Sequence, residues 1–274
     1  MRKAKDRNWF GGILGWSWLL VVLIPIYYIL VTSFKSSSTY LSGNPLALPV
    51  PPDGEQYSKV VDEGFVSYFT NSLIVTVGTV VPLLLIALMA SYAIVRGRGR
   101  AMSTTKKLFL LGLSIPIQAT IIPVYLIIIR LHLYDSLTAL ILPGIAFALP
   151  LTILILTNFM RDIPKELFES MSMDGCTEWQ MLWRLALPMS RPSLVTVGIY
   201  QALHQWNGFL FPLVLTQSPE RRVLPLFLWN FQGEFATDIP AVLAAVVLSS
   251  LPIIILYAFG RKQLVAGMTA GIGK

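Results

Sequence analysis

Polar and aromatic side chains gather at one place inside a long apolar run, the stretch "YQALHQWNGF" from Tyr200 to Phe209. On a helix, Tyr200, His204 and Asn207 fall at i, i+4 and i+7 and share one face. Hydroxyl, imidazole and amide groups exchange hydrogen bonds with a hydroxyl-rich solute, and an indole ring such as that of Trp206 stacks against it. Tyr200, His204, Trp206 and Asn207 are therefore candidate binding residues. The alternative is that they hydrogen-bond to neighbouring helices.

Four more polar side chains interrupt apolar runs elsewhere, Asn71, Ser114, Gln118 and Asn158. They are weaker candidates for binding the same solute along its path, because such groups more often make packing contacts. No metal-ligand spacing and no nucleophile constellation accompanies any of these positions. The sequence therefore predicts no catalytic residues, no metal and no enzyme activity of its own.

The composition of the chain is that of a membrane protein. Its 274 residues are 55% hydrophobic and 13% charged, with a mean hydropathy of +0.67. A soluble domain carries about twice that share of charged residues. The net charge of +7 does not indicate nucleic-acid binding, because Lys and Arg cluster at the ends of apolar runs. The single cysteine excludes an intrachain disulfide framework.

Six apolar segments are long enough to cross a bilayer. We expect spans at about 12–33, 69–94, 108–129, 137–158, 193–215 and 240–260. None contains Asp, Glu, Lys or Arg, which argues against coupling to a proton or sodium gradient. No run alternates with the period of two that a membrane β-barrel needs. The prediction is one all-α transmembrane domain over residues 1–274, with 12–33 as a retained first span.

The distribution of basic residues predicts the orientation. If the six spans alternate, 16 Lys and Arg fall on one side and five on the other. The rich side holds the N-terminal tail, the connection after 94, the segment 159–192 and the C-terminal tail. By the positive-inside rule this side is cytoplasmic, so both termini and 159–192 are cytoplasmic.

The cytoplasmic segment reads as two short helices separated by a sharp turn. Pro164 suits the first turn of the first helix, and Gly175 suits the position just past its end. Thr177 and Gln180 have the spacing of a capping box that opens the second helix. Its apolar stripe is Trp179, Leu182, Trp183 and Ala186, and Pro188 and Pro192 should end it. Such a pair of helices could lie on the membrane surface or protrude toward a partner protein.

This segment resembles the EAA loop of ABC importer permeases. That pattern has Glu-Ala-Ala, a Gly six residues after the Glu, and later Ile-x-Leu-Pro, which match Glu169, Gly175, Leu187 and Pro188. Ser170 and Met171 replace the alanines, and Leu185 replaces the isoleucine. The stretches "NSLIVTVGTVVPLLLIALMASYAIVRGRGR", "QWNGFLFPLVL" and "GMTAGIGK" also resemble the carbohydrate-uptake permeases of the maltose-transporter type.

The resemblance implies a multi-subunit importer in the cell membrane. Its partners would be a second homologous permease, two cytoplasmic ATP-binding cassette ATPases and an extracytoplasmic sugar-binding protein, with lipid around the spans. This chain has no Walker A motif, since the glycines of its tail are wrongly spaced and nothing follows Lys274. ATP would be bound by the partner subunits, and no cofactor by this chain. The resemblance assigns ATPase coupling to Glu166, Glu169, Ser170, Met171, Asp174, Gly175, Leu185, Leu187 and Pro188.

Two other functions remain open at this point. One is a channel or carrier that works without ATP, which would leave the cytoplasmic helices unexplained. The other is an ABC permease for amino acids or phosphate, against which the maltose-type resemblance weighs. The identity of the sugar or polyol is not encoded in any pattern that we recognise. We expect alternating access driven by movement of the 163–189 helices, and uncoupling of ATP hydrolysis from uptake when a bulky residue replaces Gly175.

Overall fold

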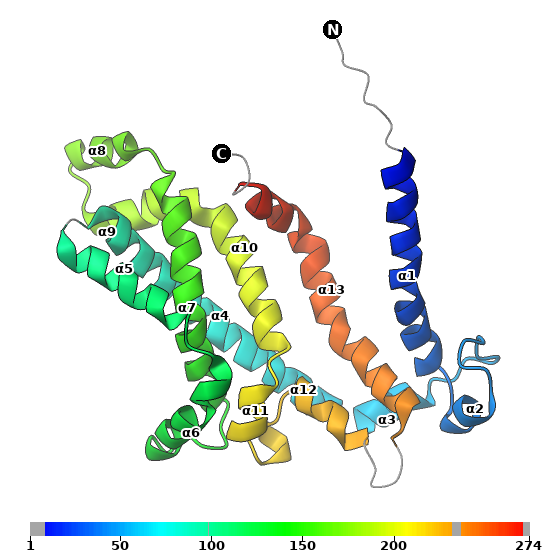
Figure 1. Ribbon diagram of the computed structural model, residues 1–274. Coiled ribbons are helices and arrows are strands. Elements are labelled where there is room, and N and C mark those ends of the chain that lie inside the picture. The colour runs from blue at the N-terminus through cyan, green and yellow to red at the C-terminus, as the bar shows by residue number, and fades with distance from the viewer. Residues whose placement is uncertain (1–8, 98, 232–236, 271–274) are drawn as a thin grey trace. The chain divides into compact units, whose positions relative to one another are not determined.

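The computed structural model describes residues 9–97, 99–231 and 237–270, and within these ranges the chain is built from helices without a β-strand (Figure 1). The all-helical class predicted from the long apolar segments is confirmed. Several residues on which the orientation and tail predictions rest lie outside the described ranges, namely Arg2, Lys3, Lys5, Arg7, Arg98 and Lys274.

Within the described ranges, four helices are long and apolar enough to cross a membrane. They are α1 (Trp9–Ser33), α4 (Phe65–Arg96), α7 (Thr138–Arg161) and the Ile239–Ala258 part of α13 (Ile239–Ala270). They contain the predicted spans 12–33 and 69–94 and nearly all of 137–158 and 240–260. Each carries an internal proline, which membrane helices tolerate because neighbouring groups satisfy the freed backbone carbonyls.

The predicted span 108–129 is not one straight helix. It consists of α5 (Arg100–Gly112), the 3₁₀ turn η1 (Ile117–Thr120) and α6 (Ile121–Arg130), with a bend of 93° between Met102–Gly112 and Ile117–Arg130. Pro116 explains the break. It lies in an extended conformation, offers no N–H, and disfavours helical geometry in the residue before it.

The predicted span 193–215 is also divided. It is made of α10 (Leu187–Trp206) and the short α11 (Leu210–Leu215). Asn207 ends α10, where its backbone N–H and its side-chain Nδ2 both donate to the carbonyl of Leu203, at 3.2 and 2.8 Å. A short polar side chain that bonds the local backbone in this way competes with helix continuation.

The chain divides into two compact units. The first comprises residues 1–65 and 228–251 and contains α1, α2 (Ser37–Ser42), α3 (Glu55–Asp62), the 3₁₀ turn η4 (Leu228–Phe231) and the start of α13. Asp238 connects these elements, because its carboxylate accepts from Lys59 Nζ at 2.6 Å and from Ser37 Oγ at 3.0 Å. Lys35 is buried, and its Nζ donates to the carbonyls of Asn44 and Pro45.

The second unit, residues 66–227 and 252–274, contains the remaining helices. Its α8 (Lys165–Met173), α9 (Glu178–Met181) and the π-helical segment η2 (Leu182–Ala186) lie at one end of α7 and α10, and α6 and α11 lie at the other (Figure 1). Glycines sit where helices approach closely. A Cβ on Gly78 would come within 2.9 Å of Ile141, and one on Gly112 within 2.8 Å of Pro150. Small residues at crossings are the usual means of packing membrane helices.

The end of the second unit near α6 and α11 is held by polar contacts to the loop that follows α11. This loop includes η3 (Pro219–Arg221) and leads to α12 (Leu224–Phe227). Asp135, which precedes α7, accepts from the backbone N–H groups of Gln217 and Ser218 at 2.8 and 3.0 Å and from the Ser218 hydroxyl. These bonds, the Ser218 hydroxyl first, hold the pKa of Asp135 below its ordinary value.

Candidate functional site

The first helix of the 159–192 segment is α8, and it ends at a residue in the left-handed backbone conformation, Gly175. Pro164 is the N-cap residue, one position before the first turn. At the other end Gly175 has φ +78°, the N–H of Gly175 donates to the Ser172 carbonyl at 3.1 Å, and the N–H of Cys176 donates to the Met171 carbonyl at 3.0 Å. These two bonds form a complete Schellman motif. The predicted turn at Gly175 is therefore confirmed in detail.

The second helix starts at the predicted residue. Thr177 is its N-cap; the Gln180 N–H donates to Thr177 Oγ1 at 3.3 Å, and the Thr177 N–H donates to Gln180 Oε1 at 2.9 Å. This reciprocal pair is the capping box that the spacing predicted.

The predicted end of this helix is wrong. Pro188 and Pro192 do not terminate it, because the helix continues through η2 into α10 and runs without a break from Glu178 to Trp206. Pro188 lies in the first turn of the α-helical part, directly after the π-helical residues. A π-helical turn bonds i to i+5 and so changes the local ladder one turn before the proline that cannot donate to it. The 159–192 segment and the fifth predicted span therefore share one continuous helix.

The predicted apolar stripe is only partly buried. Leu182 and Ala186 are buried and Trp183 is half-buried, but Trp179 is 61% exposed and meets Trp183 edge-on, with ring centroids 5.4 Å apart. Met181 takes a buried place instead. The 3.6-residue period assumed for the stripe does not hold across η2, because a π turn contains more residues than an α turn.

The residues assigned to ATPase coupling divide into an exposed group and a group that is partly buried. Phe168 is buried and anchors α8 in a cluster with Tyr92, Met181 and Leu182. The assigned residues that remain exposed are Glu166, Glu169, Ser170, Asp174, Gly175 and Pro188. Those that are partly buried against the same cluster are Met171, Leu185 and Leu187. The acidic residues Glu166, Glu169 and Asp174 are therefore exposed, whereas Phe168 anchors the helix.

An ion pair that the sequence did not reveal fixes the second helix. Arg96, at the end of α4, donates from Nη2 to Glu178 Oε1 at 3.0 Å, and the Tyr92 hydroxyl donates to Glu178 Oε2 at 2.5 Å. The Arg96 guanidinium and then the Tyr92 hydroxyl hold the pKa of Glu178 below its ordinary value. The partners are separated by 82 residues in the chain, so no local pattern could join them.

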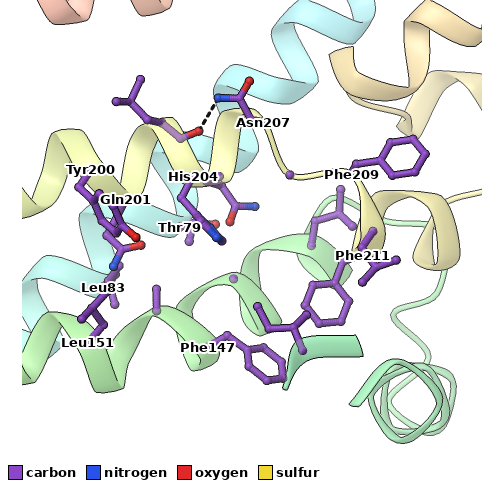
Figure 2. Close-up of a pocket in the computed structure, with 18 of the residues that line it drawn as sticks. Thr79, Leu83, Phe147, Leu151, Tyr200, Gln201, His204, Asn207, Phe209 and Phe211 are labelled. Carbon is purple, nitrogen blue, oxygen red and sulfur yellow. Dashed lines mark hydrogen bonds between the residues drawn. The ribbon is translucent and has the colours of Figure 1, made fainter. Parts of the chain in front are cut away.

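A cavity of about 910 Å³ opens in the second unit among α4, η1, α7, α10 and α11 (Figure 2). Both interrupted spans border it, one through Leu113 and Ile115 at the 93° bend and the other through Asn207, Gly208 and Phe209. Non-helical backbone at membrane depth is tolerated where it lines such a cavity.

The cavity wall combines polar groups with aromatic rings. Its polar side chains are Thr79, Gln118, Tyr200, Gln201, His204, Gln205 and Asn207. Phe147 and Phe211 lie together on one side with ring centroids 5.4 Å apart (Figure 2). Gln201 is buried and donates from Nε2 to Thr152 Oγ1 at 3.1 Å, so it joins α10 to α7. No hydrogen bond within the described ranges occupies the Tyr200 hydroxyl or the His204 ring, and both residues are exposed.

The structure brings together three of the four candidate binding residues. Tyr200, His204 and Asn207 line the cavity, although Asn207 turns its amide back to Leu203 (Figure 2). Trp206 does not line it; this ring is buried and contacts Phe69 edge-on at a centroid distance of 5.6 Å.

Of the weaker candidates, only Gln118 is in the lining; Asn71, Ser114 and Asn158 are not. The Asn71 amide donates to the carbonyls of Glu220 and Arg222, at 2.8 and 2.9 Å, and so makes the packing contact that was its alternative.

Long apolar helices, a cavity beside two apolar segments whose helices are interrupted, and an amphipathic pair of helices are features of a membrane permease. Residues 71–269 match the family described as "Binding-protein-dependent transport system inner membrane component", and the chain belongs to this family. The family's role is transport rather than catalysis.

The similar proteins cover nearly the whole chain. A putative ABC transporter permease protein, ORF2, of Caldicellulosiruptor sp. (strain Rt8B.4) is 43% identical over 270 residues, 98% of each chain. The diacetylchitobiose uptake system permease protein DasC of Streptomyces coelicolor is 35% identical over 92% of each chain. A bacterial alginate ABC transporter, solved in complex with an alginate pentasaccharide-bound periplasmic protein, contains a chain with a TM-score of 0.64 and 15% identity. That match covers 94% of this chain and 99% of the solved chain, and it supports the fold alone.

Proposed function

We propose that the chain is the membrane-spanning permease subunit of an ATP-driven importer for sugars. The observation that carries the proposal is the match, over 92% of both chains, to a permease named for diacetylchitobiose uptake. The cavity is consistent with it, since hydroxyl, amide and imidazole groups beside phenylalanine rings are the means of binding a sugar.

The chain crosses the membrane six times in this proposal, with both termini and the 159–192 segment in the cytoplasm. The four long helices account for four crossings, α5–α6 for a fifth and α10–α11 for the sixth. The bias of Lys and Arg toward one side supports this orientation.

The partners are a second homologous permease, two cytoplasmic ATPases that bind ATP, and an extracytoplasmic sugar-binding protein. The exposed acidic face of α8, with Glu166 and Glu169, supports docking of an ATPase at this helix. The family description, "Binding-protein-dependent transport system inner membrane component", supports the third partner. The second permease would complete the path beside the cavity.

The mechanism is alternating access. Closure of the ATPases on ATP displaces α8, and two rigid connections lead from α8 to the cavity. One is α7, through the short link before Lys165; the other is the continuous helix from Glu178 to Trp206. A nucleotide moves the equilibrium only by binding one of the two arrangements more tightly.

The solute is a neutral sugar in this proposal. Among the described residues, the cavity lining includes no Asp, Glu, Lys or Arg. An acidic sugar would lose its hydration there without gaining a counter-charge.

The experiment is ATP hydrolysis and uptake by the complex purified through a tagged copy of this chain and placed in vesicles. Diacetylchitobiose and other neutral disaccharides should stimulate both when the binding protein is added, and alginate oligosaccharides should not. Uptake by vesicles that hold this chain alone, without nucleotide, would establish an ATP-independent carrier instead.

A further inference from the structure

Arg96 joins α4 to both helices of the coupling segment. Its guanidinium carbon lies 5.0 Å from the centroid of the Phe168 ring in α8, and its Nη2 lies 3.0 Å from Glu178 Oε1 at the start of α9. Tyr92, one turn earlier in α4, repeats this arrangement, because its ring packs 6.2 Å from Phe168 and its hydroxyl donates to Glu178. One face of α4 therefore holds the two helices at their junction.

The same helix forms part of the cavity wall. Thr79 and Leu83 of α4 line the cavity and are almost fully buried. Leu83 and Arg96 are separated by roughly 20 Å at a rise of 1.5 Å per residue. Leu88 and Tyr92 bury this part of α4 in the cluster that also contains Phe168 and Leu182, so α4 is packed against the coupling segment as well as bonded to it.

We propose that Arg96 and Tyr92 of α4 form a clamp with Phe168 of α8 and Glu178 of α9. The clamp makes α4 move together with α8, so that displacement of the coupling segment reaches the cavity wall through α4. The proposal rests on the importer function above and adds a third connection to it. The links through α7 and α10 follow from the chain itself, whereas this connection exists only through side chains.

The chemistry of the clamp requires arginine. A planar guanidinium stacks on an aromatic ring and also presents a fork of donors to a carboxylate, and an ammonium group cannot do both with the same geometry. The Arg96 guanidinium and then the Tyr92 hydroxyl lower the pKa of Glu178, so its carboxylate stays ionised to a lower pH than an ordinary glutamate. The pair remains partly exposed, so its strength should fall as salt is added.

A purely structural role predicts lower yield or stability, whereas a clamp predicts lost mechanical coupling in protein that is correctly assembled. Paired spin labels distinguish these roles. In a Cys176→Ser background, one label replaces Met173, which is 89% exposed on α8, and the other replaces Val81, which is 52% exposed on α4. The distance between them is measured in the reconstituted complex, before and after trapping with ATP and vanadate.

In the wild-type arrangement the two labels should keep one distance in both states, because the helices move as one body. In Arg96→Ala and in the isosteric Glu178→Gln, trapping should change the distance between the labels in part of the molecules, namely those in which α8 moves and α4 does not. The fraction in which α4 follows α8 should fall at least about fivefold, the lower end of usual coupling factors. The double variant should lose less than the sum of the two single losses, because both changes remove the contact between Arg96 and Glu178. Arg100→Ala is the matched control, since Arg100 is exposed and forms no salt bridge with a described residue.

Membrane level and co-purification of the ATPases are measured for every variant. A constant label distance in well-assembled Arg96→Ala and Glu178→Gln would overturn the clamp and leave the importer function intact. An additive loss in the double variant would also overturn it. A wild-type complex that hydrolyses no ATP would remove the importer function, and the clamp would fall with it.

Discussion

The left-handed backbone of Gly175 supports a quantitative prediction about the coupling segment. Its φ is +78°, and a Cβ built on it would meet no atom within 4 Å. The cost of a substitution therefore comes from the backbone conformation and not from the volume of the new side chain. An L-residue in this region loses roughly 1–2 kcal/mol, and Asn loses less because its short polar side chain bonds locally. A β-branched residue should lose most.

The expected order of stability of the turn is Gly, then Asn, then Ala, then Val. A loss of about 1–2 kcal/mol corresponds to a change of roughly 5- to 30-fold in the opening equilibrium. This opening exposes the Cys176 amide, whose bond to Met171 closes the Schellman motif. Hydrogen exchange of the 165–182 peptides should accelerate by that factor in Gly175→Ala, with peptides of α4 as the internal reference.

Transport should follow the same order if the turn sets the angle between α8 and the following helix. Sugar uptake per ATP hydrolysed should fall in Gly175→Ala and further in Gly175→Val, and should be least affected in Gly175→Asn. Equal exchange rates in the Asn and Ala variants would refute the backbone argument. A loss that tracks side-chain volume regardless of backbone preference would point instead to contact with the docked ATPase.

Three further predictions follow from other parts of the second unit. Gly144→Leu should destabilise the purified protein by about 1–3 kcal/mol, because a Cβ there already lies 2.8–3.0 Å from side chains of α4 and α10. Thermal unfolding measures this loss of stability, and Gly15→Leu is the control, since a Cβ at Gly15 would meet no atom within 4 Å. Asp135→Asn should speed proteolysis of the 216–222 loop several-fold while keeping the positive φ that Asn tolerates. Because the pKa of Asp135 is lowered in the folded protein, the stabilising effect of its carboxylate is complete above pH 3.8 and is lost as the pH falls through the depressed value, which a pH series of the same digestion tests. His204→Ala should raise the solute concentration needed for half-maximal uptake several-fold without changing basal ATP hydrolysis, and unchanged uptake would remove His204 from the path.

The features of the fold that depend on nearby residues were predicted well from the sequence. The turn at Gly175 and the capping box at Thr177 depend on atoms within a few residues, so residue type and spacing suffice to specify them. The long apolar helices were found for a similar reason, because length and composition alone decide whether a segment can span a bilayer. In these elements the local preference and the tertiary structure agree.

The failures concern places where the backbone departs from a regular helix. Prolines were expected to end the helix after Glu178, but Pro188 and Pro192 are accommodated inside it. Pro116 and Asn207 lie inside apolar runs, and there they do interrupt the helix. Hydropathy does not distinguish the two outcomes, which depend on neighbouring helices and on which carbonyls they satisfy.

In the candidate site, too, local spacing was predicted correctly and tertiary contacts were not. Tyr200 and His204 were placed correctly on one helical face, and the structure locates that face at a cavity. Trp206 was chosen for its chemistry, but its orientation is set by packing against Phe69. The pair formed by Arg96 and Glu178 was missed entirely, because side chains far apart in the chain meet only after folding.

The uninterrupted helix from Glu178 to Trp206 restricts how this stretch can change in length. Inserting one residue near its middle would turn the far end by about 100°, at 3.6 residues per turn, and would shift it by about 1.5 Å. Tyr200 and His204 would then point toward lipid or a neighbouring helix while the Glu178 end stayed in register. Only insertions of whole turns would keep both ends correctly oriented. Insertions and deletions should therefore be rare in this stretch, and more common in the proline-rich connection at 43–54.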